Sequence, residues 1–537
     1  MDFEFYTAAR IIFGAGKFKE IGKLAREHGK QALVIIGGGS LQKAGVVQRL
    51  VDLLKEHGIV CNFYQVTGEP QVETVDEGVS AAKKSQAEMV ISLGGGSVID
   101  TGKAISGLVT NGGSVMDYLE GVGKGKRITR PALPFIAIPT TAGTGSEVTK
   151  NAVICSRTQK FKKSIRSPHL IPKIALVDPL LTHTMPPAVT ASSGLDALTQ
   201  LIEAYVSKGA NPITDALAQK GITLAASSLY RAYCNGNDAE ARQNMALASL
   251  LSGIALANAG LGAVHGIAAA LGGLFPIPHG IACAVLLPHV VEMNFKALLT
   301  KNPVDSIVKK YRQLCKLLLG KEIDPKDGVS PAVEFLHGLC DKMAIPSLTS
   351  FGINKDDIPS IVHDKEAISY CKQKYPAPNI TYIEMDVNST VLDRQFDIAT
   401  AFQVIEHIQN LSKFIERLKQ IVKPNGVIFI STPNVKQPQK GKVQNPFHFN
   451  EMNYAQFRKL ISDNFSSFEI LGVAYGTSNR IRHLLGKLPF YKWGKRLNRK
   501  SKFKKIAVHA LDLTSFTIIN SQVEEKSADL LAVCHNT

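Results

Sequence analysis

Short apolar runs alternate with amphipathic segments over about the first 180 residues of the chain. Strands are predicted at 32–38, 88–97 and 134–143, because each is a short block rich in Val, Ile, Leu or Ala that ends at a glycine or threonine. Between the first two blocks, VVQRLVDLLKEHG places apolar residues at helical spacing. This alternation is typical of a largely parallel sheet that is covered by helices.

From about Pro187 to Asp364 the pattern changes to helices without strands, and the alternation of strand and helix returns near residue 365. Its clearest parts are FDIATAF, the helical LSKFIERLKQIV and the strand VIFISTPN. The sequence therefore predicts an overall α/β fold with three domains. These are an α/β domain at 1–185, an all-helical domain at 186–364 and a partial α/β domain at 365–537.

One segment, 243–291, has no Asp, Glu, Lys or Arg and in that respect resembles a membrane span. It is interrupted by Pro276, Pro278 and several polar residues, so we expect helices buried inside a soluble domain. The N-terminus has no basic segment followed by an apolar run, which argues against a secretory signal. The eight cysteines are scattered without a CxxC pair, which favours a reducing compartment, and we expect a cytoplasmic protein.

The formal net charge of +17 is unevenly distributed. Residues 365–537 carry 25 Lys and Arg against 14 Asp and Glu, which leaves a net +6 for the first 364 residues. Within 480–505, eleven Lys and Arg accompany no acid and are interleaved with Leu, Phe, Tyr and Trp493. Such a segment can bind an anionic membrane or a nucleic acid. We favour the simpler interpretation, a solvated helix and loop.

A glycine-rich turn follows the second predicted strand. Gly94, Gly95, Gly96 and Ser97 come directly after VISL and lead into a predicted helix. Unpaired amides and the helix dipole favour a phosphate at such a helix N-terminus, and the missing side chains let it approach the backbone. The spacing differs from the GxGxxG fingerprint, so a tight turn without a ligand is the alternative.

A second candidate loop, PTTAGTGSEVT at 139–149, follows the third strand. Its hydroxyls, on Thr140, Thr141, Thr144 and Ser146, can bond phosphate, ribose or carboxamide at the edge of the sheet where ligands bind in open α/β folds. Taken alone, the loop could instead be a turn in which Thr144 or Ser146 caps a helix.

The helical domain contains a candidate metal site. Asp196 and Gln200 are four residues apart and share a helix face, while His265 and His279 lie in the charge-free segment. A single histidine in an apolar run is more often a core residue than a ligand. Two histidines and an aspartate would each need a buried partner, however, whereas one metal ion satisfies all of them.

These motifs give the chain a family resemblance. GGGSVIDTGKA, PTTAGTGSEVT, MPPAVTASSGLDALTQLIEAYVS, NPITDALA and HGIAAALGGLFPIPHG occur in the order seen in iron-containing (group III) alcohol dehydrogenases, and the match runs from IIFGAG to about Asp364. The resemblance implies a Rossmann-like dinucleotide-binding domain followed by a helical metal-binding domain. It also implies hydride transfer between an alcohol or aldehyde and NAD(P), with the ion acting as a Lewis acid, and a homo-oligomeric enzyme.

The resemblance also assigns the site residues. The ligands of Fe(II), or in some members Zn(II), carry over to Asp196, Gln200, His265 and His279. The family has histidine where this chain has Gln200, a weaker ligand. A further family histidine is replaced by Ala269. The cofactor contacts carry over to Gly95, Gly96, Ser97, Thr140, Thr141, Thr144 and Lys162.

The turn after the first predicted strand bears on cofactor choice. It reads GGGSLQK, and Gly37, Gly38 and Gly39 provide no carboxylate that would repel a 2′-phosphate. Ser40 and Lys43 are placed to receive one. We therefore expect NADP(H), with NAD as the alternative.

Residues from about 365 onward resemble the later part of class I S-adenosylmethionine methyltransferases. The resemblance rests on FDIATAFQVIEH within 396–434 and on Asp386, which corresponds to an acid near the adenine. The glycine-rich turn that holds the methionine part of the donor is missing, and dehydrogenase helix occupies its place. We therefore do not expect S-adenosylmethionine to be used. A catalytically impaired fusion protein is a further alternative, since the dehydrogenase part also ends one or two helices early by the resemblance.

Overall fold

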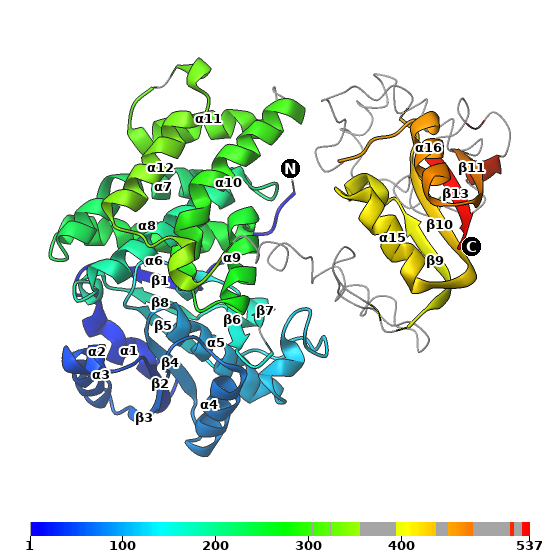
Figure 1. Ribbon diagram of the computed structural model, residues 1–537. Helices are drawn as coiled ribbons and strands as arrows, with labels where there is room; N and C mark the ends of the chain where they lie inside the picture. The colour runs from blue at the N-terminus through cyan, green and yellow to red at the C-terminus, as the bar shows by residue number, and fades with distance from the viewer. Residues whose placement is uncertain are drawn as a thin grey trace. The chain divides into compact units, whose positions relative to one another are not determined.

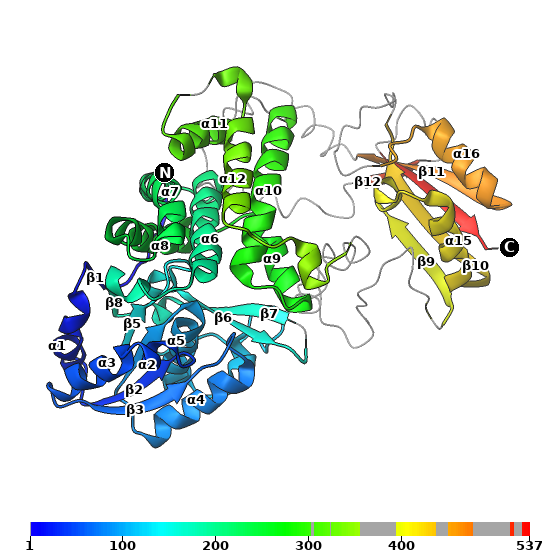
Figure 2. The same cartoon turned by 60° about the vertical axis from the view of Figure 1, so that its left-hand side comes forward.

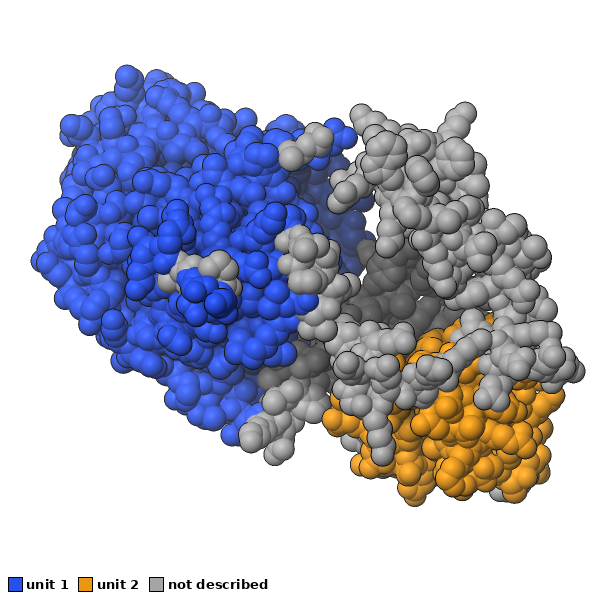
Figure 3. Space-filling model, turned by 90° about the horizontal axis from the view of Figure 1, so that it is seen from above, with its two compact units in different colours: residues 1–382 blue, residues 383–537 orange. Residues whose placement is uncertain are grey.

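The computed structural model describes most of the chain, and it divides into two compact units, Met1–Tyr382 and Ile383–Thr537 (Figure 3). The described residues are 2–159, 161–301, 306–322, 324–354, 392, 394–435, 449–475, 516–519, 523 and 529–536. The predicted strand ITYIEMDV with Asp386, the predicted helix before it and the basic segment 480–505 lie outside these residues. The two units are described separately below.

The first unit begins with a six-stranded sheet in which every pair of neighbouring strands is parallel. The strand order is β1 (Arg10–Phe13), β8 (Ile174–Val177), β5 (Phe135–Pro139), β4 (Met89–Gly94), β2 (Gln31–Ile36) and β3 (Val60–Gln65). The chain runs from β2 outward to β3 and then returns to β4 on the other side of β2. Ligands of α/β proteins bind beyond the carboxyl ends of strands at such a reversal. The three predicted strands correspond to β2, β4 and β5.

Helices cover both faces of this sheet (Figure 1). Ala32, Val34 and Ile36 of β2 share a buried core with α1 (Ile21–Arg26) and α3 (Val46–Lys55). The alternate residues Leu33 and Ile35 pack with α4 (Val72–Lys84) and α5 (Gly96–Asn111) on the opposite face. Because side chains alternate along a strand and both faces are covered, β2 is apolar throughout, as buried parallel strands are.

The remaining elements of the first unit are mainly helical. A hairpin of β6 (Asn151–Ser156) and β7 (Phe161–Arg166) precedes the helices. These are α6 (Pro187–Val206), α7 (Pro212–Cys234), α8 (Ala239–Ala259), α9 (Ala263–Leu274), α10 (His279–Lys301), α11 (Ser306–Leu319) and α12 (Ser330–Lys342). Pro187 begins α6, and Asn211 caps α7 through a reciprocal box with Thr214. The helical part expected from Pro187 onward is therefore present in the described residues.

The charge-free segment 243–291 lies in α8, α9 and the start of α10. Ala248, Ala255 and Ala282 are fully buried in the core that joins these helices. By length and composition α10 could cross a membrane, and 39% of its most apolar window is buried. Helices α8 and α9 pass the same test only if they are counted together as one span, although they meet at a bend of 99°. Core helices of soluble proteins have the same composition.

Two glycines set how closely the helices approach their neighbours. A Cβ on Gly253 of α8 would lie 2.1 Å from the carbonyl oxygen of Gly145, which belongs to the loop after β5. A Cβ on Gly280 of α10 would lie 2.2 Å from the carbonyl oxygen of Ser192 in α6. The first contact brings the loop after β5 against α8, and the second brings the N-terminus of α10 against α6.

The second unit contains a five-stranded sheet and two helices in its described residues. The strand order is β12 (Phe516–Ile519), β11 (Ser467–Tyr475), β13 (Asp529–His535), β10 (Val422–Pro433) and β9 (Phe396–Phe402). Strands β9 and β10 are parallel, whereas β13 is antiparallel to both β10 and β11. Helices α15 (Leu411–Ile421) and α16 (Tyr454–Asn464) pack on the sheet (Figure 2). The strand, helix and strand predicted from FDIATAF onward are β9, α15 and β10.

Short helices and single turns connect these elements. They are α2 (Ser40–Lys43) and the 3-10 turns Lys17–Glu20, Val115–Tyr118, Ser146–Val148, Pro168–Leu170, Pro179–Thr182, Pro325–Asp327, Leu348–Phe351 and Ile405–His407.

Candidate metal and nucleotide site

The glycine-rich turn lies at the carboxyl end of β4, where α5 begins at Gly96 without a side-chain cap. A Cβ on Gly96 would lie 2.7 Å from the Thr144 hydroxyl, and one on Gly95 would lie 3.3 Å from Thr141. The turn is thus in contact with the loop 139–149, and a side chain at Gly96 would displace that loop. Free amides at the start of α5 next to threonine hydroxyls fit the phosphates of a dinucleotide.

The loop 139–149 is held against α5 by a buried lysine. Lys103 is fully buried and donates hydrogen bonds to the carbonyl oxygen of Ser146 at 2.9 Å and to the Thr149 hydroxyl at 2.8 Å. It also forms an ion pair with Asp100 at 3.0 Å. Burial lowers the pKa of Lys103 in spite of this pair. Burial also raises the pKa of the neighbouring Glu147 to about 7.

The other predicted cofactor residues occupy the same sheet edge or the hairpin beside it. Thr140 is buried and its amide donates to the carbonyl oxygen of Gly94 at 3.0 Å. Beyond β2, Gly38, Ser40 and Lys43 are exposed. Lys162 lies on β7, where its ammonium pairs with Glu69 at 2.6 Å and its side chain passes close to Gly272 of α9. Ser97 and Thr101 belong to the first turns of α5, where the Thr101 hydroxyl donates to the Ser97 carbonyl.

Three helices bring Asp196, His265 and His279 together in a cluster in which Asp196 is buried and the histidines are partly exposed. Asp196 lies in α6, His265 in α9 and His279 at the start of α10. The distance from Asp196 Oδ1 to Nε2 is 3.3 Å for His265 and 3.9 Å for His279. Cys283, one helical turn after His279, completes a set whose candidate ligand atoms all lie within 4.8 Å of one another. A carboxylate, two imidazoles and a thiol around one small space fit a divalent transition metal ion.

Glu203 fixes the orientation of the His265 ring. Its Oε2 accepts a hydrogen bond from Nδ1 of His265 at 2.6 Å, and its Oε1 accepts one from the amide of Val264 at 2.7 Å. Nδ1 is thereby engaged by Glu203, and Nε2 is the ring nitrogen that faces Asp196. Carboxylates commonly support metal-binding histidines in this way. The sequence interpretation missed Glu203, although it follows Asp196 by seven residues and so shares its helix face.

The charges of the cluster reinforce one another. Burial alone would raise the pKa of Asp196, but the hydrogen bond with His265 and the charge of His279 lower it below its usual value. Burial would lower the pKa of His265, yet the charge of the Cys283 sulfur and the hydrogen bonds to Asp196 and Glu203 raise it well above its usual value. The carboxylate of Asp196 therefore stays ionised in spite of its burial.

Gln200 is placed differently from the other predicted ligands. It lies in α6 one turn after Asp196 and is buried. Its side-chain oxygen Oε1, the atom able to bind a metal, accepts a hydrogen bond from the Ser252 hydroxyl at 2.8 Å. The structure thus directs this oxygen to α8.

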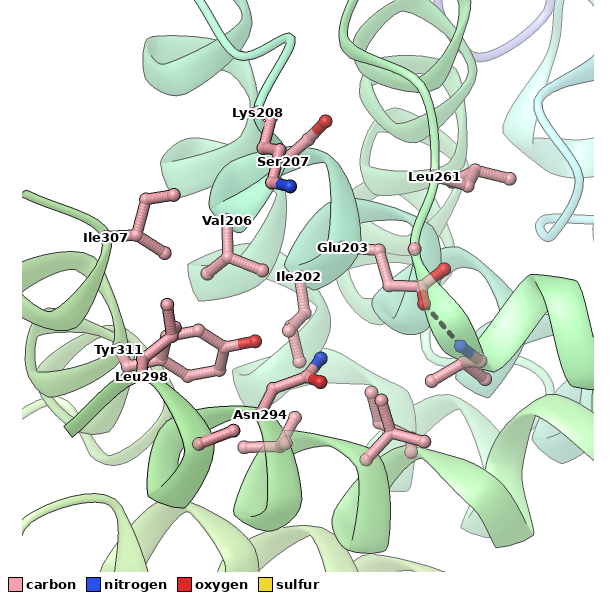
Figure 4. A pocket seen from close by; sticks show the side chains of 16 residues that line it. Ile202, Glu203, Val206, Ser207, Lys208, Leu261, Asn294, Leu298, Ile307 and Tyr311 are labelled. Atoms are coloured by element: carbon pink, nitrogen blue, oxygen red, sulfur yellow. Dashed lines mark hydrogen bonds between the residues drawn. The ribbon is translucent and has the colours of Figure 1, made fainter. Parts of the chain in front are cut away.

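A cavity of about 430 Å³ lies beside this cluster in the helical part. Figure 4 shows that mostly apolar side chains of α6, α10 and α11 line it, with Ser207, Lys208, Asn294 and Tyr311 among the polar residues. Glu203 forms part of its wall, so this one carboxylate contacts the cavity on one side and His265 on the other.

Comparison with protein families agrees with this geometry. Residues 8–179 match the family described as iron-containing alcohol dehydrogenase, and residues 190–383 match the C-terminal part of the Fe-containing alcohol dehydrogenase family. A third match, to a methyltransferase domain, covers residues 339–467.

Individual proteins show the same similarity. The chain is 39% identical over 355 residues to alcohol dehydrogenase 4 of Saccharomyces cerevisiae strain YJM789, a match that covers 66% of this chain and 89% of the yeast protein. The crystal structure of a 1,3-propanediol oxidoreductase matches with a TM-score of 0.62 and 36% identity, over 67% of this chain and 92% of the other. A sulfoacetaldehyde reductase from Bifidobacterium kashiwanohense, solved in complex with NAD+, matches with a TM-score of 0.60 and 29% identity, over 72% and 96% of the two chains.

Proposed function

Because this chain belongs to the iron-containing alcohol dehydrogenase family, we propose that its first unit transfers a hydride between a small alcohol or aldehyde and NAD(P). The observation that carries this proposal is that Asp196, His265 and His279 lie together around one small space. The glycine turn after β4 and the loop 139–149 supply a dinucleotide site in the same unit. We assign the nucleotide-binding domain to 1–185, the helical metal-binding domain to 186–364 and the methyltransferase-like domain to 365–537.

The chemistry divides between the bound groups and the chain. A divalent ion supplies a Lewis acid that makes the alcohol proton easier to remove, and the nicotinamide accepts the hydride. Asp196, His265 and His279 would hold the ion, and Glu203, which accepts from Nδ1 of His265, would orient Nε2 towards it. Gly95 and Gly96 leave room for the pyrophosphate, while Thr140, Thr141 and Thr144 offer hydroxyls to the cofactor. Lys162 is close enough to the histidines for its charge to act on His279.

We further propose that the cofactor is NADP(H). The turn after β2 has only glycines at 37–39, and the exposed Ser40 and Lys43 follow it. A 2′-phosphate there would meet a cation and a hydroxyl instead of the carboxylate that binds a ribose 2′-hydroxyl in NAD enzymes. We also propose that the enzyme is cytoplasmic and homo-oligomeric.

Methyl transfer is not part of this proposal. The match to a methyltransferase domain begins at residue 339, inside the helical domain of the dehydrogenase. A strand with a glycine-rich turn for the methionine part of the donor would have to precede it there. The described residues at 330–342 instead form α12.

The experiment is a turnover assay of the purified full chain, stripped of metal and then loaded with Fe(II) or Zn(II). We expect NADP-dependent oxidation of short alcohols or diols, or the reverse reduction of aldehydes, seen as a change in absorbance of the reduced nicotinamide. Asp196→Ala should lose both bound metal and turnover, while the exposed Asp341→Ala of α12 should keep both. A folded, metal-loaded protein without turnover on a broad panel of alcohols and aldehydes would refute the proposal.

A further inference from the structure

A thiol is the fourth candidate donor in the cluster of Asp196, His265 and His279. Cys283 Sγ lies 3.8 Å from Nε2 of His265 and 3.7 Å from Nε2 of His279. Cys283 is one helical turn after His279, so both side chains leave α10 on the same face. A structural buried cysteine packs as a small apolar side chain. Here the sulfur is directed at two imidazole nitrogens, and it also interacts with Asp196.

Because the side-chain oxygen of Gln200 is already hydrogen-bonded, the fourth coordination position of the ion is open to Cys283. The side-chain oxygen of Gln200 accepts its hydrogen bond from Ser252, and an amide oxygen is in any case a weak ligand for a transition metal. To bind the ion, Gln200 would have to give up this buried hydrogen bond. Cys283 needs no such exchange, because the hydrogen-bond contacts of its thiol are with the histidines of the cluster.

The distances within the cluster agree with tetrahedral coordination. With metal–ligand bonds of roughly 2.0–2.3 Å, neighbouring donor atoms of a tetrahedral zinc site lie about 3.3–3.6 Å apart. Four of the six pairs formed by the donor atoms of Asp196, His265, His279 and Cys283 measure 3.3, 3.7, 3.8 and 3.9 Å. All six pairs lie within 4.8 Å, so the donors would draw together by up to about 1 Å to complete the shell.

We propose that Cys283, and not Gln200, is the fourth protein ligand of the metal, and that this donor set selects Zn(II) over Fe(II). The inference rests on the dehydrogenase function proposed above. On binding, the thiol releases its proton to solvent and the sulfur donates a lone pair to the ion. A carboxylate and a thiolate then balance the two positive charges. Thiolate sulfur is a soft ligand that favours zinc, and zinc accepts a fifth donor during turnover.

Cobalt substitution tests the sulfur directly. Co(II) bound to a thiolate has an intense charge-transfer absorption in the near ultraviolet that nitrogen and oxygen ligands do not give. We expect this band in the Co(II)-loaded full chain and in Gln200→Ala, and its loss in Cys283→Ser. Cys340→Ser is the matched control, because its sulfur donates only to the carbonyl oxygen of Ala284 and serine can do the same.

Metal competition tests the selectivity. Apoprotein is dialysed without oxygen against equal Fe(II) and Zn(II), and the bound metals are measured by elemental analysis. The ratio of zinc to iron should fall by at least about tenfold in Cys283→Ser, since even supporting groups of a metal site change its affinity by roughly 10–100-fold. It should be unchanged in Cys340→Ser.

The outcomes separate this inference from the proposed function. A Co(II)-loaded chain that lacks the thiolate band, or a band that survives in Cys283→Ser, overturns the inference even if alcohol oxidation is observed. A thiolate band in a chain without dehydrogenase turnover would overturn the proposed function and leave the ligand assignment in place.

Discussion

Replacing Glu147 with Gln should stabilise the protein at high pH and have little effect at low pH. Glu147 is buried in the loop beside Lys103, and burial raises its pKa from an ordinary value of 4.5 to about 7. The folded state therefore holds this proton more tightly than the unfolded state. The stability that it contributes is fully present below about pH 4.5 and is lost as the pH rises to about 7.

The size of the effect follows from the two pKa values. Each tenfold difference in proton affinity corresponds to about 1.4 kcal/mol, so the ionised Glu147 costs about 3 kcal/mol above pH 7. In a unit that ends at Tyr382, unfolding entropy of about 2.1 cal/mol/K per residue converts this to about 4 °C in Tm. Glutamine cannot ionise and should recover most of it.

Calorimetric scans of the full chain at pH 5 and pH 8 measure this effect. The Tm of Glu147→Gln relative to the unmodified protein should rise between the two pH values, whereas that of Glu73→Gln, an exposed acid on α4, should stay constant. An equal difference at both pH values would refute the reasoning, because it would mean that Glu147 has the same proton affinity in the folded and unfolded states.

Three other substitutions probe the remaining parts of the site. Glu203→Gln should weaken metal binding by about 10–100-fold in a chelator competition, because the hydrogen bond that orients His265 loses its charge; an unchanged affinity would contradict that role. Lys43→Ser should raise KM for NADP about tenfold and leave KM for NAD unchanged, because it removes one charged hydrogen bond to the 2′-phosphate. Equal changes for both cofactors would argue against this contact. Gly253→Ala should lower the stability by about 1–3 kcal/mol, measured as Tm, because its Cβ would meet the backbone of Gly145 at 2.1 Å. Gly338→Ala in α12, with open space around its Cβ, should not destabilise and is the control.

The sequence predicted the parts of the fold that depend on local pattern. Strands β2, β4 and β5 are continuous apolar runs, and the charge-free segment 243–291 forms the helices α8, α9 and the start of α10, because periodicity and length report on local structure. The meeting of Asp196 with His265 and His279 was also predictable, since buried polar groups need a common partner.

The roles of Glu203, Cys283 and Lys162 depend on packing between elements, which local pattern does not contain. Glu203 supports a metal-binding ring only because α9 crosses α6 at that turn, and Cys283 joins the cluster because Gly280 lets α10 lie against α6. Lys162 was predicted to bind the cofactor, and its partner in the structure is Glu69, which is distant in sequence. Helical spacing places Glu203 on the helix face of Asp196 and Cys283 on that of His279. Spacing alone could not select these two residues from the other buried positions.

The wide separation of Asp196 and His265 in the sequence gives the proposed ion a part in folding. The two residues are 69 positions apart, and each belongs to a different helix. An ion that binds both closes a long loop that the unfolded chain would otherwise have to order at the expense of conformational entropy. The ligands proposed for catalysis would therefore also stabilise the helical domain, and removal of the ion should lower its Tm.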